Sequence, residues 1–136
     1  MSERKIYGFN IAVKDLNAAK GTYEKLFGVT SEYVPEEAFA FPGLEAYRLN
    51  VNGLAVHLIA SKTDNTSVAK FLQKNGEGMF LISMQVDDIE KEQNIIKEEM
   101  GAQFILDKPV DAGWCKVNFI HPRSLHGVQV EVIEVK

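Results

Sequence analysis

Two polar residues interrupt apolar, strand-like segments of the sequence, and both have side chains that can transfer protons. His57 lies in "LAVHLIA" (residues 54–60), and Glu131 lies in "VQVEVIEV" (residues 128–135). If both face one pocket, Glu131 can act as a proton acceptor, or the two can share a proton. The alternatives are an internal hydrogen-bonded pair, because a buried glutamate needs a partner, or polar residues on a solvated strand face. The sequence leaves all three interpretations open.

An internal repeat predicts how these residues are positioned. Residues 8–16 ("GFNIAVKDL") and 81–89 ("LISMQVDDI") each read as an alternating strand that runs into the start of a helix. Asp15 and Asp88 can cap the two helices, and Gly28 and Gly101 can end them in the left-handed conformation. Both pairs are 73 residues apart. The constant spacing indicates a duplicated module.

Each predicted helix is followed by three candidate strands. In the first half these are residues 30–34, 46–51 and 54–60, and in the second half residues 102–106, 115–121 and 128–135. The Asn52-Gly53 pair between alternating segments is a strong hairpin signal. Residues 64–75 favour a linking helix with Val68, Phe71 and Leu72 facing inward. We therefore predict one α+β domain, with module 1 at about residues 5–62, the linking helix at about 64–75 and module 2 at about 78–135.

This organisation has a geometric consequence for ligand binding. Two tandem βαβββ modules would form a cupped, mostly antiparallel sheet with the helices on the outside. The concave face of such a sheet is a natural site for a small molecule. We expect residues at matching positions of the two modules, including His57 and Glu131, to meet across the cup.

Composition excludes several classes of partner. The chain has 136 residues, a formal net charge of −4 and no run of lysines or arginines, so we expect no nucleic acid and no membrane partner. The N-terminal residues show no apolar signal region, and no apolar run approaches membrane length. A single cysteine allows no intrachain disulfide and no cysteine-cluster metal site. We expect a cytoplasmic protein.

Three segments resemble the vicinal oxygen chelate superfamily, which includes glyoxalase I, bleomycin-resistance proteins and extradiol dioxygenases. They are "IAVKDLNAAKGTYEKLFG", "VAKFLQKNGEG" followed by a strand and "VDDIE", and "FIHPRSLHGVQVEV", and together they span nearly the whole chain. Within the superfamily, the pattern is most similar to methylmalonyl-CoA epimerase. The resemblance implies a homodimer and a small-molecule ligand.

The resemblance also implies four metal-ligand positions, which fall here on Gly8, His57, Leu81 and Glu131. Gly8 and Leu81 offer no side-chain ligand, whereas a catalytic divalent metal needs three or four protein ligands. A shifted site with Asn10, Ser83 or Gln85 would use weak ligands. We therefore expect no metal, and if one binds, His57 and Glu131 would hold it.

The segment between the first helix and the hairpin carries acidic and aromatic side chains. The resemblance implies a second catalytic glutamate here; we assign Glu45, with Glu36 and Glu37 as alternatives. The expected ligand-binding residues are Phe39, Phe41, Tyr47, Trp114, Asn10, Ser83 and Gln85. The alternative is that the carboxylates are solvated loop residues and the aromatics belong to the core.

Two functions follow from this interpretation. The first is a proton-transfer isomerase, epimerase or lyase that acts on a small carboxylate, ketone or acyl thioester, with Glu131, His57 and Glu45 as catalytic residues. The second is a non-catalytic binding protein of the bleomycin-resistance type, which holds a small organic compound in the cup without a metal. The resemblance implies metal-binding histidines at the positions of Gly8 and Leu81; their absence favours the second function, and the epimerase-like segments favour the first.

Overall fold

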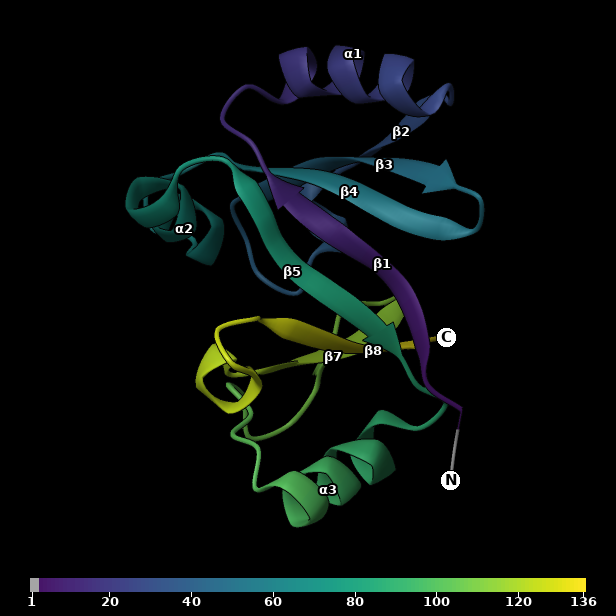
Figure 1. Cartoon of the computed structure of the whole chain (residues 1–136), viewed down its shortest axis with the longest axis vertical. Coiled ribbons are helices and arrows are strands. Elements are labelled where there is room, and N and C mark those ends of the chain that lie inside the picture. Colours follow the sequence, from purple (N-terminus) through teal and green to yellow (C-terminus); the bar gives the residue numbers. More distant parts are fainter. Residues whose placement is uncertain (1–2) are drawn as a thin grey trace. The chain divides into compact units, whose positions relative to one another are not determined.

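A computed structural model describes residues 3–136, and the predicted α+β fold class is confirmed (Figure 1). The chain divides into two compact units. One comprises Gly8–Phe80, and the other comprises Leu81–Lys136 together with the described residues up to Tyr7. Each unit contains four strands and a long helix that follows the βαβββ order of the predicted repeat.

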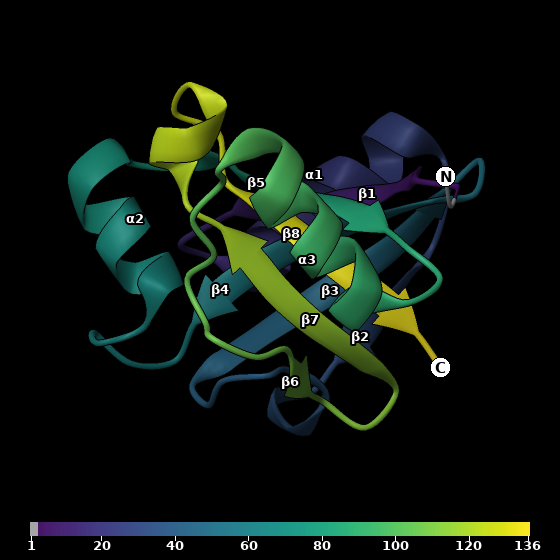
Figure 2. The ribbon, with the colours of Figure 1, turned by 90° about the horizontal axis from the view of Figure 1, so that it is seen from below.

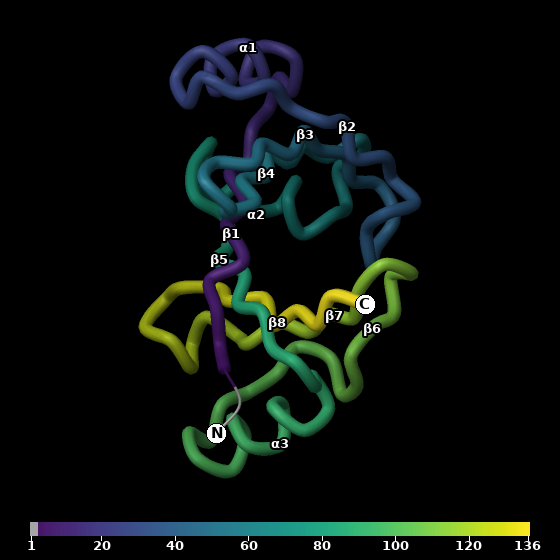
Figure 3. The backbone as a smooth tube through the Cα atoms, turned by 90° about the vertical axis from the view of Figure 1, so that its right-hand side faces the viewer, coloured from purple at the N-terminus to yellow at the C-terminus, as the bar shows by residue number. Residues whose placement is uncertain are grey.

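The unit Gly8–Phe80 is a four-stranded sheet with a helix on each face. Its strand order is β2-β3-β4-β1, in which β1 and β4 are parallel and the other pairs are antiparallel. The elements are β1 (Lys5–Ala12), α1 (Leu16–Phe27), β2 (Ser31–Val34), a 3₁₀ turn (Glu36–Ala38), β3 (Leu44–Val51), β4 (Leu54–Ser61) and α2 (Ser67–Asn75). Figure 3 shows α1 and α2 on opposite sides of this sheet.

Strand alternation divides the core of this unit between the two faces. Alternate β4 residues Val56, Leu58 and Ala60 pack with the α1 side chains, whereas Ile59 packs with Val68 of α2. The inward-facing residues predicted for the linking helix are confirmed, because Val68 is buried and Phe71 and Leu72 pack against the same cluster as Ile59.

The second unit has the strand order β5-β8-β7-β6. Its elements are β5 (Gly78–Gln85), α3 (Ile89–Met100), β6 (Val110–Asp111), β7 (Cys115–Ile120), a 3₁₀ turn (Pro122–Leu125) and β8 (Val130–Val135). Strand β5 enters this unit at Leu81. Figure 2 shows α3 lying across β7 and β8. Val132 on β8 and Ile120 on β7 pack with Ile89 and Ile96 of α3, which leaves the other face of the sheet free of this helix.

The predicted helix ends are confirmed in both modules. The Asp15 and Asp88 side chains accept hydrogen bonds from the backbone N–H groups of Ala18 and Lys91. Gly28 and Gly101 adopt left-handed conformations, with φ of 68° and 64°. The predicted hairpin is also present, with Asn52 and Gly53 both at positive φ between β3 and β4.

The predicted strand at residues 102–106 is wrong. In that segment only Phe104 makes a β-bridge, to Ile120, and the second strand of the unit along the chain is the two-residue β6. Buried polar side chains also hold residues 102–107. Asn118 on β7 bonds the Leu106 backbone and the Gln93 side chain on α3, and Gln93 donates to the Asp107 carbonyl. Two backbone hydrogen bonds, from Ile105 N–H to the Phe119 carbonyl and from His121 N–H to the Gln103 carbonyl, flank the bridge, and the side-chain bonds hold the rest of the segment.

A buried ion pair ties the first described residues to α3. Arg4 donates from Nε and Nη2 to the Glu92 carboxylate, at 3.1 and 2.8 Å, and the Glu92 side chain is fully buried. Both residues belong to the same unit. Within residues 3–136, no helix is long and apolar enough to cross a membrane.

Candidate functional site

Glu131 and Ser83 form a hydrogen-bonded pair on adjacent parallel strands. They are register partners in β8 and β5, and Ser83 Oγ donates to Glu131 Oε1 at 2.7 Å. Their neighbours Met84 and Val132 pack in the α3 core, so both polar side chains point to the opposite face of the sheet. Ser83 is buried and Glu131 is partly buried.

The surroundings of Glu131 shift its proton affinity toward neutral pH. Burial raises the pKa of Glu131 from 4.5 to about 7, because the carboxylate form loses hydration, while the Ser83 hydrogen bond acts in the opposite direction. A carboxylate whose pKa lies near the working pH is suited to accept a proton and release it again.

His57 lies in a row of three polar side chains on neighbouring strands of the unit Gly8–Phe80. Its register partners are Asn10 on β1 and Arg48 on β3, and all three lie on the face away from α1. Burial lowers the pKa of His57 to about 4, and the positive charge of Arg48 contributes to the same shift. The imidazole is therefore neutral at neutral pH. We call Asn10, His57 and Arg48 the polar row.

The predicted site residues thus fall into two groups, one in each unit. Ser83, Gln85 and Glu131 share the face of the second unit that is opposite α3, because Gln85 lies two residues beyond Ser83 on β5. Asn10 and His57 share the α1-free face of the first unit. The pairing of His57 with Glu131 stays a prediction.

Glu45 and Tyr47 lie on the other face of β3 from His57. Their register partners are Ala60 and Leu58, whose side chains pack toward α1. The Tyr47 ring lies under Lys20 of α1, with Nζ at 5.1 Å from its centroid. Glu45 accepts a hydrogen bond from the Tyr33 hydroxyl at 2.8 Å, which raises the pKa of Tyr33. The structure therefore does not bring Glu45 and Tyr47 together with His57.

The alternative carboxylates have different surroundings. Glu36 accepts a hydrogen bond from the Gly43 N–H at 2.6 Å and another from Lys62 at 3.3 Å, and these bonds lower its pKa. It therefore organises the loop before β3. Glu37 is exposed.

The predicted aromatic ligand residues are dispersed. Phe39 packs against the core cluster on the α2 face of the sheet, and Phe41 is 40% exposed. Trp114 lies beside Tyr7 in the second unit, with ring centroids 6.4 Å apart. Phe39 is the one of these three that borders the sheet face carrying the polar row.

The residues at the four family metal positions do not fit a metal ion. A Cβ atom on Gly8 would overlap the carbonyl oxygen of Ala55, so that position has no room for a ligand side chain. Leu81 is buried and apolar. In either unit's described residues, no cluster of three histidine, cysteine or carboxylate ligands includes His57 or Glu131. Two ligands are too few for a catalytic metal site.

An acidic cluster of Asp88, Glu90 and Glu134 lies at the start of α3, with ligand oxygens within 4.8 Å of one another. Glu134 already accepts a hydrogen bond from the Ile89 N–H, and Glu90 pairs with Lys116. These contacts account for the cluster as helix capping and surface pairing.

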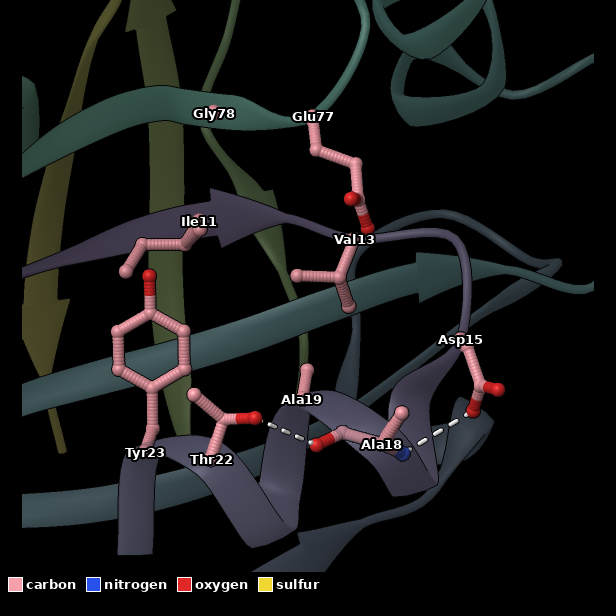
Figure 4. Close-up of a pocket in the computed structure, with 9 residues that line it drawn as sticks. All are labelled: Ile11, Val13, Asp15, Ala18, Ala19, Thr22, Tyr23, Glu77 and Gly78. Carbon is pink, nitrogen blue, oxygen red and sulfur yellow. Dashed lines mark hydrogen bonds between the residues drawn. The ribbon is translucent and has the colours of Figure 1, made fainter. Parts of the chain in front are cut away.

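A pocket of about 420 Å³ lies on the α1 side of the first unit (Figure 4). Figure 4 shows Tyr23 rising from α1 toward Ile11 of β1, and Glu77 reaching toward Val13. Its two carboxylates are engaged with the backbone, Asp15 at Ala18 and Glu77 at Lys14. The pocket is therefore separated from the polar row by the sheet.

The sequence-based interpretation missed Arg48, although the hairpin contained the signal. The two-residue turn at Asn52-Gly53 pairs Val51 with Leu54, and this register places Arg48 opposite His57. The same count places Tyr47 opposite Leu58, on the face of the α1 core. Ser83, by contrast, was selected from strand alternation and lies beside Glu131 as a direct hydrogen-bond donor.

Comparison with known proteins identifies the same relatives throughout the chain. The family model of the Glyoxalase/Bleomycin resistance protein/Dioxygenase superfamily matches residues 5–132. The human mitochondrial methylmalonyl-CoA epimerase is 30% identical over 124 residues, which cover 90% of this chain and 69% of the human protein.

Solved structures agree with this assignment. A hypothetical protein from Bacillus halodurans has a TM-score of 0.87 at 30% identity, covering 98% of this chain and 96% of the other. A Streptomyces coelicolor methylmalonyl-CoA epimerase variant in complex with 2-nitronate-propionyl-CoA has a TM-score of 0.78 at 27% identity, covering 99% of both chains. The chain belongs to the Glyoxalase/Bleomycin resistance protein/Dioxygenase superfamily.

Proposed function

We propose that the protein is a proton-transfer isomerase that acts on an acyl thioester, with Glu131 as the proton acceptor and without a divalent metal. The observation that carries the proposal is the Ser83–Glu131 pair, in which a partly buried carboxylate has its pKa raised to about 7 and one oxygen held at 2.7 Å by a hydroxyl donor. The ligand class comes from the relatives, one of which is an epimerase in complex with methylmalonyl-CoA.

The proposed chemistry moves one proton. The Cα–H bond of the acyl group breaks, the proton goes to Glu131, and the electron pair is delocalised into the thioester as an enolate. After the planar enolate turns its opposite face to Glu131, return of the proton from Glu131 to Cα restores the acyl group with inverted configuration. Ser83 holds the carboxylate in place, and its hydrogen bond stabilises the ionised form that accepts the proton.

The metal-free part of the proposal is supported by Gly8 and Leu81, which leave two of the four family positions without a ligand. Metal analysis of the purified protein tests it directly. We expect less than about 0.1 equivalent of zinc, cobalt, nickel or manganese after dialysis against each ion, since two ligands bind weakly. Stoichiometric retention of any of these metals would contradict the proposal.

Hydrogen exchange tests the proton transfer. We expect the wild-type protein, treated with EDTA, to wash deuterium from heavy water into the α-position of methylmalonyl-CoA or propionyl-CoA. Glu131→Gln is expected to slow exchange by at least about 100-fold, the usual contribution of a general base. Glu134→Gln is the matched control, because it lies on the same strand and its amide oxygen can still accept from Ile89.

A non-catalytic binding protein of the bleomycin-resistance type is the second candidate. The apolar cluster beside the polar row favours it, because Phe71 and Phe80 stack edge to face at 5.3 Å and Phe39 packs against the same cluster. Absence of exchange with every thioester, together with tight binding of a planar aromatic compound, would select this function. Equal exchange in wild type and Glu131→Gln would exclude Glu131 as the base.

We also propose a homodimer, as the family resemblance implies. Sedimentation equilibrium of the purified chain tests the assembly, and the expected mass is twice the 15.2 kDa of the monomer. A monomer at all concentrations up to about 100 μM would contradict it, since a stable homodimer has a dissociation constant well below this value.

A further inference from the structure

The polar row brings a cation and two neutral N–H donors to one face of the first unit. Asn10, His57 and Arg48 come from β1, β4 and β3, and His57 is the direct register partner of both of the others. Adjacent strands lie about 4.8 Å apart, so the three side chains rise side by side from the sheet. None of the three packs in the α1 core, which occupies the opposite face.

The polar row borders a buried apolar cluster on the same face. Two residues further along each strand, the same face carries apolar side chains that pack with α2. These are Ala12 on β1, Ile59 on β4 and Ala46 on β3. Ala12, Ile59 and Ala46 are at most 2% exposed, so this part of the face is covered, whereas Asn10, His57 and Arg48 are partly exposed. The polar row is therefore the part of this face that a ligand can contact.

Arg48 is available to such an anion. Its Nη2 donates to Glu32 Oε2 at 3.0 Å, and the two side chains are 38% and 76% exposed. An ion pair this exposed contributes little, about 0 to 1 kcal/mol, and a ligand anion can replace the glutamate. The guanidinium has five N–H donors in a planar fork, which suits the two oxygens of a carboxylate or phosphate.

From this arrangement we infer that the polar row is an anion-binding subsite, in which Arg48 binds a carboxylate or phosphate of the ligand and Asn10 and His57 donate further N–H hydrogen bonds. This inference deepens the proposed function, on which it rests for the ligand class, by requiring an anionic group on the acyl thioester.

The test measures binding by calorimetry at low ionic strength, with malonyl-CoA, acetyl-CoA and free malonate as probes. Arg48→Met retains much of the side-chain volume and removes the charge. We expect it to weaken malonyl-CoA binding by at least about tenfold, as loss of a charge-assisted hydrogen bond does. Glu32→Gln removes the competing carboxylate and is expected to strengthen binding about two- to fivefold.

Lys62→Met is the matched control, because Lys62 is an exposed cation of the same unit that pairs with Glu36. It is expected to bind every probe as the wild type does. Thermal melting of each variant confirms that it is folded. If wild-type protein binds none of the probes, or if Arg48→Met binds all of them as tightly as wild type does, the inference is wrong.

The probes also distinguish the two sources of the anion. If the acyl carboxylate occupies the subsite, wild type binds malonyl-CoA more tightly than acetyl-CoA, and Arg48→Met abolishes the difference. If a CoA phosphate occupies it, Arg48→Met weakens both thioesters equally and leaves malonate unaffected. Either pattern supports an anion subsite at Arg48.

Repeating the titrations in the Glu131→Gln background separates this inference from the proposed function. If binding in this background depends on Arg48 but the wild type shows no proton exchange, the anion subsite is supported and the isomerase proposal is wrong. If exchange depends on Glu131 but binding is independent of Arg48, the isomerase proposal is supported and the anion subsite is wrong.

Discussion

The Ser83 hydroxyl donates a hydrogen bond to Glu131 Oε1 at 2.7 Å, joining β5 to β8 on the face of the sheet away from α3. The next residue along each strand, Met84 or Val132, packs on the other face in the α3 core. The pair thus joins a carboxyl group with a raised pKa to a hydroxyl that holds one of its oxygens in place.

Replacement of Ser83 by alanine is expected to raise the pKa of Glu131 above about 7, because the hydroxyl stabilises the carboxylate form. In a plot of the α-proton exchange rate against pH, the rise on the acid side would move to higher pH. At pH 7 the rate would fall about fivefold if the pKa rises by about one unit. Ser83→Thr keeps the hydroxyl and serves as the control. If the pH at which the rate rises is the same in Ser83→Ala and wild type, the hydrogen bond does not control the ionisation of Glu131.

Glu131→Gln is expected to stabilise the fold at alkaline pH. The folded protein retains a proton on Glu131 up to about pH 7, whereas an unfolded glutamate loses it near 4.5, so wild-type stability falls as pH rises through this window. The cost is on the order of 3 kcal/mol at pH 8 and disappears below pH 4.5. Urea unfolding at pH 4, 6 and 8 measures it. If the difference in unfolding free energy between the variant and the wild type is the same at all three pH values, the pKa of Glu131 is not raised in the folded protein.

His57→Gln is expected to show the opposite pH dependence. The folded protein keeps His57 neutral down to about pH 4, whereas the unfolded chain takes up a proton near 6.5, so wild-type stability is lost as pH falls between these values. The variant has no histidine at this position and does not lose this unfolding free energy, which in the wild type is on the order of 3 kcal/mol at most. Its stability relative to wild type should therefore rise as pH falls from 7 to 4. His126→Asn, at an exposed histidine, serves as the comparison.

Gly8→Ala is expected to destabilise the protein by about 2 kcal/mol or more, because its Cβ would overlap the Ala55 carbonyl oxygen and force β1 away from β4. Gly21→Ala is the matched control. Gly21 lies in the middle of α1, and a methyl group added there would meet no atom of a neighbouring element within 4 Å, so alanine should stabilise by about 0.5 to 1 kcal/mol. Chemical unfolding measures the change in unfolding free energy of each variant, which should be a loss for Gly8→Ala and a gain for Gly21→Ala. Equal changes in the two variants would refute the steric explanation.

Arg4→Ala is expected to destabilise the protein by about 3 kcal/mol, because it leaves the fully buried Glu92 carboxylate without the guanidinium that makes two hydrogen bonds to it. Lys5→Ala removes a neighbouring cation whose pairing with Glu3 is exposed, and little change is expected. Thermal and urea unfolding measure both. A loss in Arg4→Ala no larger than that in Lys5→Ala would indicate that the pair contributes no net stability.

Much of the architecture could be predicted because its signals are local. Asp15 and Gly28 specify where α1 begins and ends through bonds to residues within one turn, and the same holds for Asp88 and Gly101. The Asn52-Gly53 turn specified a hairpin and, with it, the register of β3 on β4. The segment at residues 102–106 was misjudged because its backbone pairing stops after one bridge, and the Leu106 N–H bonds the side chain of Asn118, twelve residues away along the chain.

The candidate site depended more strongly on long-range contacts. Alternation along β5 placed Ser83 on the expected face, but its role as the donor to Glu131 depends on the pairing of β5 with β8, 48 residues away. Glu45 was assigned from the family pattern without considering how side chains alternate along β3. This alternation places the Glu45 side chain on the α1 face of the sheet. Arg48 was missed for the same reason.

The sequence by itself determined the repeat, the helix ends, the hairpin and the identity of the side chains at the four family positions, because each of these depends on residue type and short-range spacing. Only the tertiary structure decided that Gly8 has no room for a side chain and that burial moves the pKa of Glu131 and His57 in opposite directions. Steric exclusion and desolvation both depend on atoms brought together by strand pairing, and no local pattern encodes them.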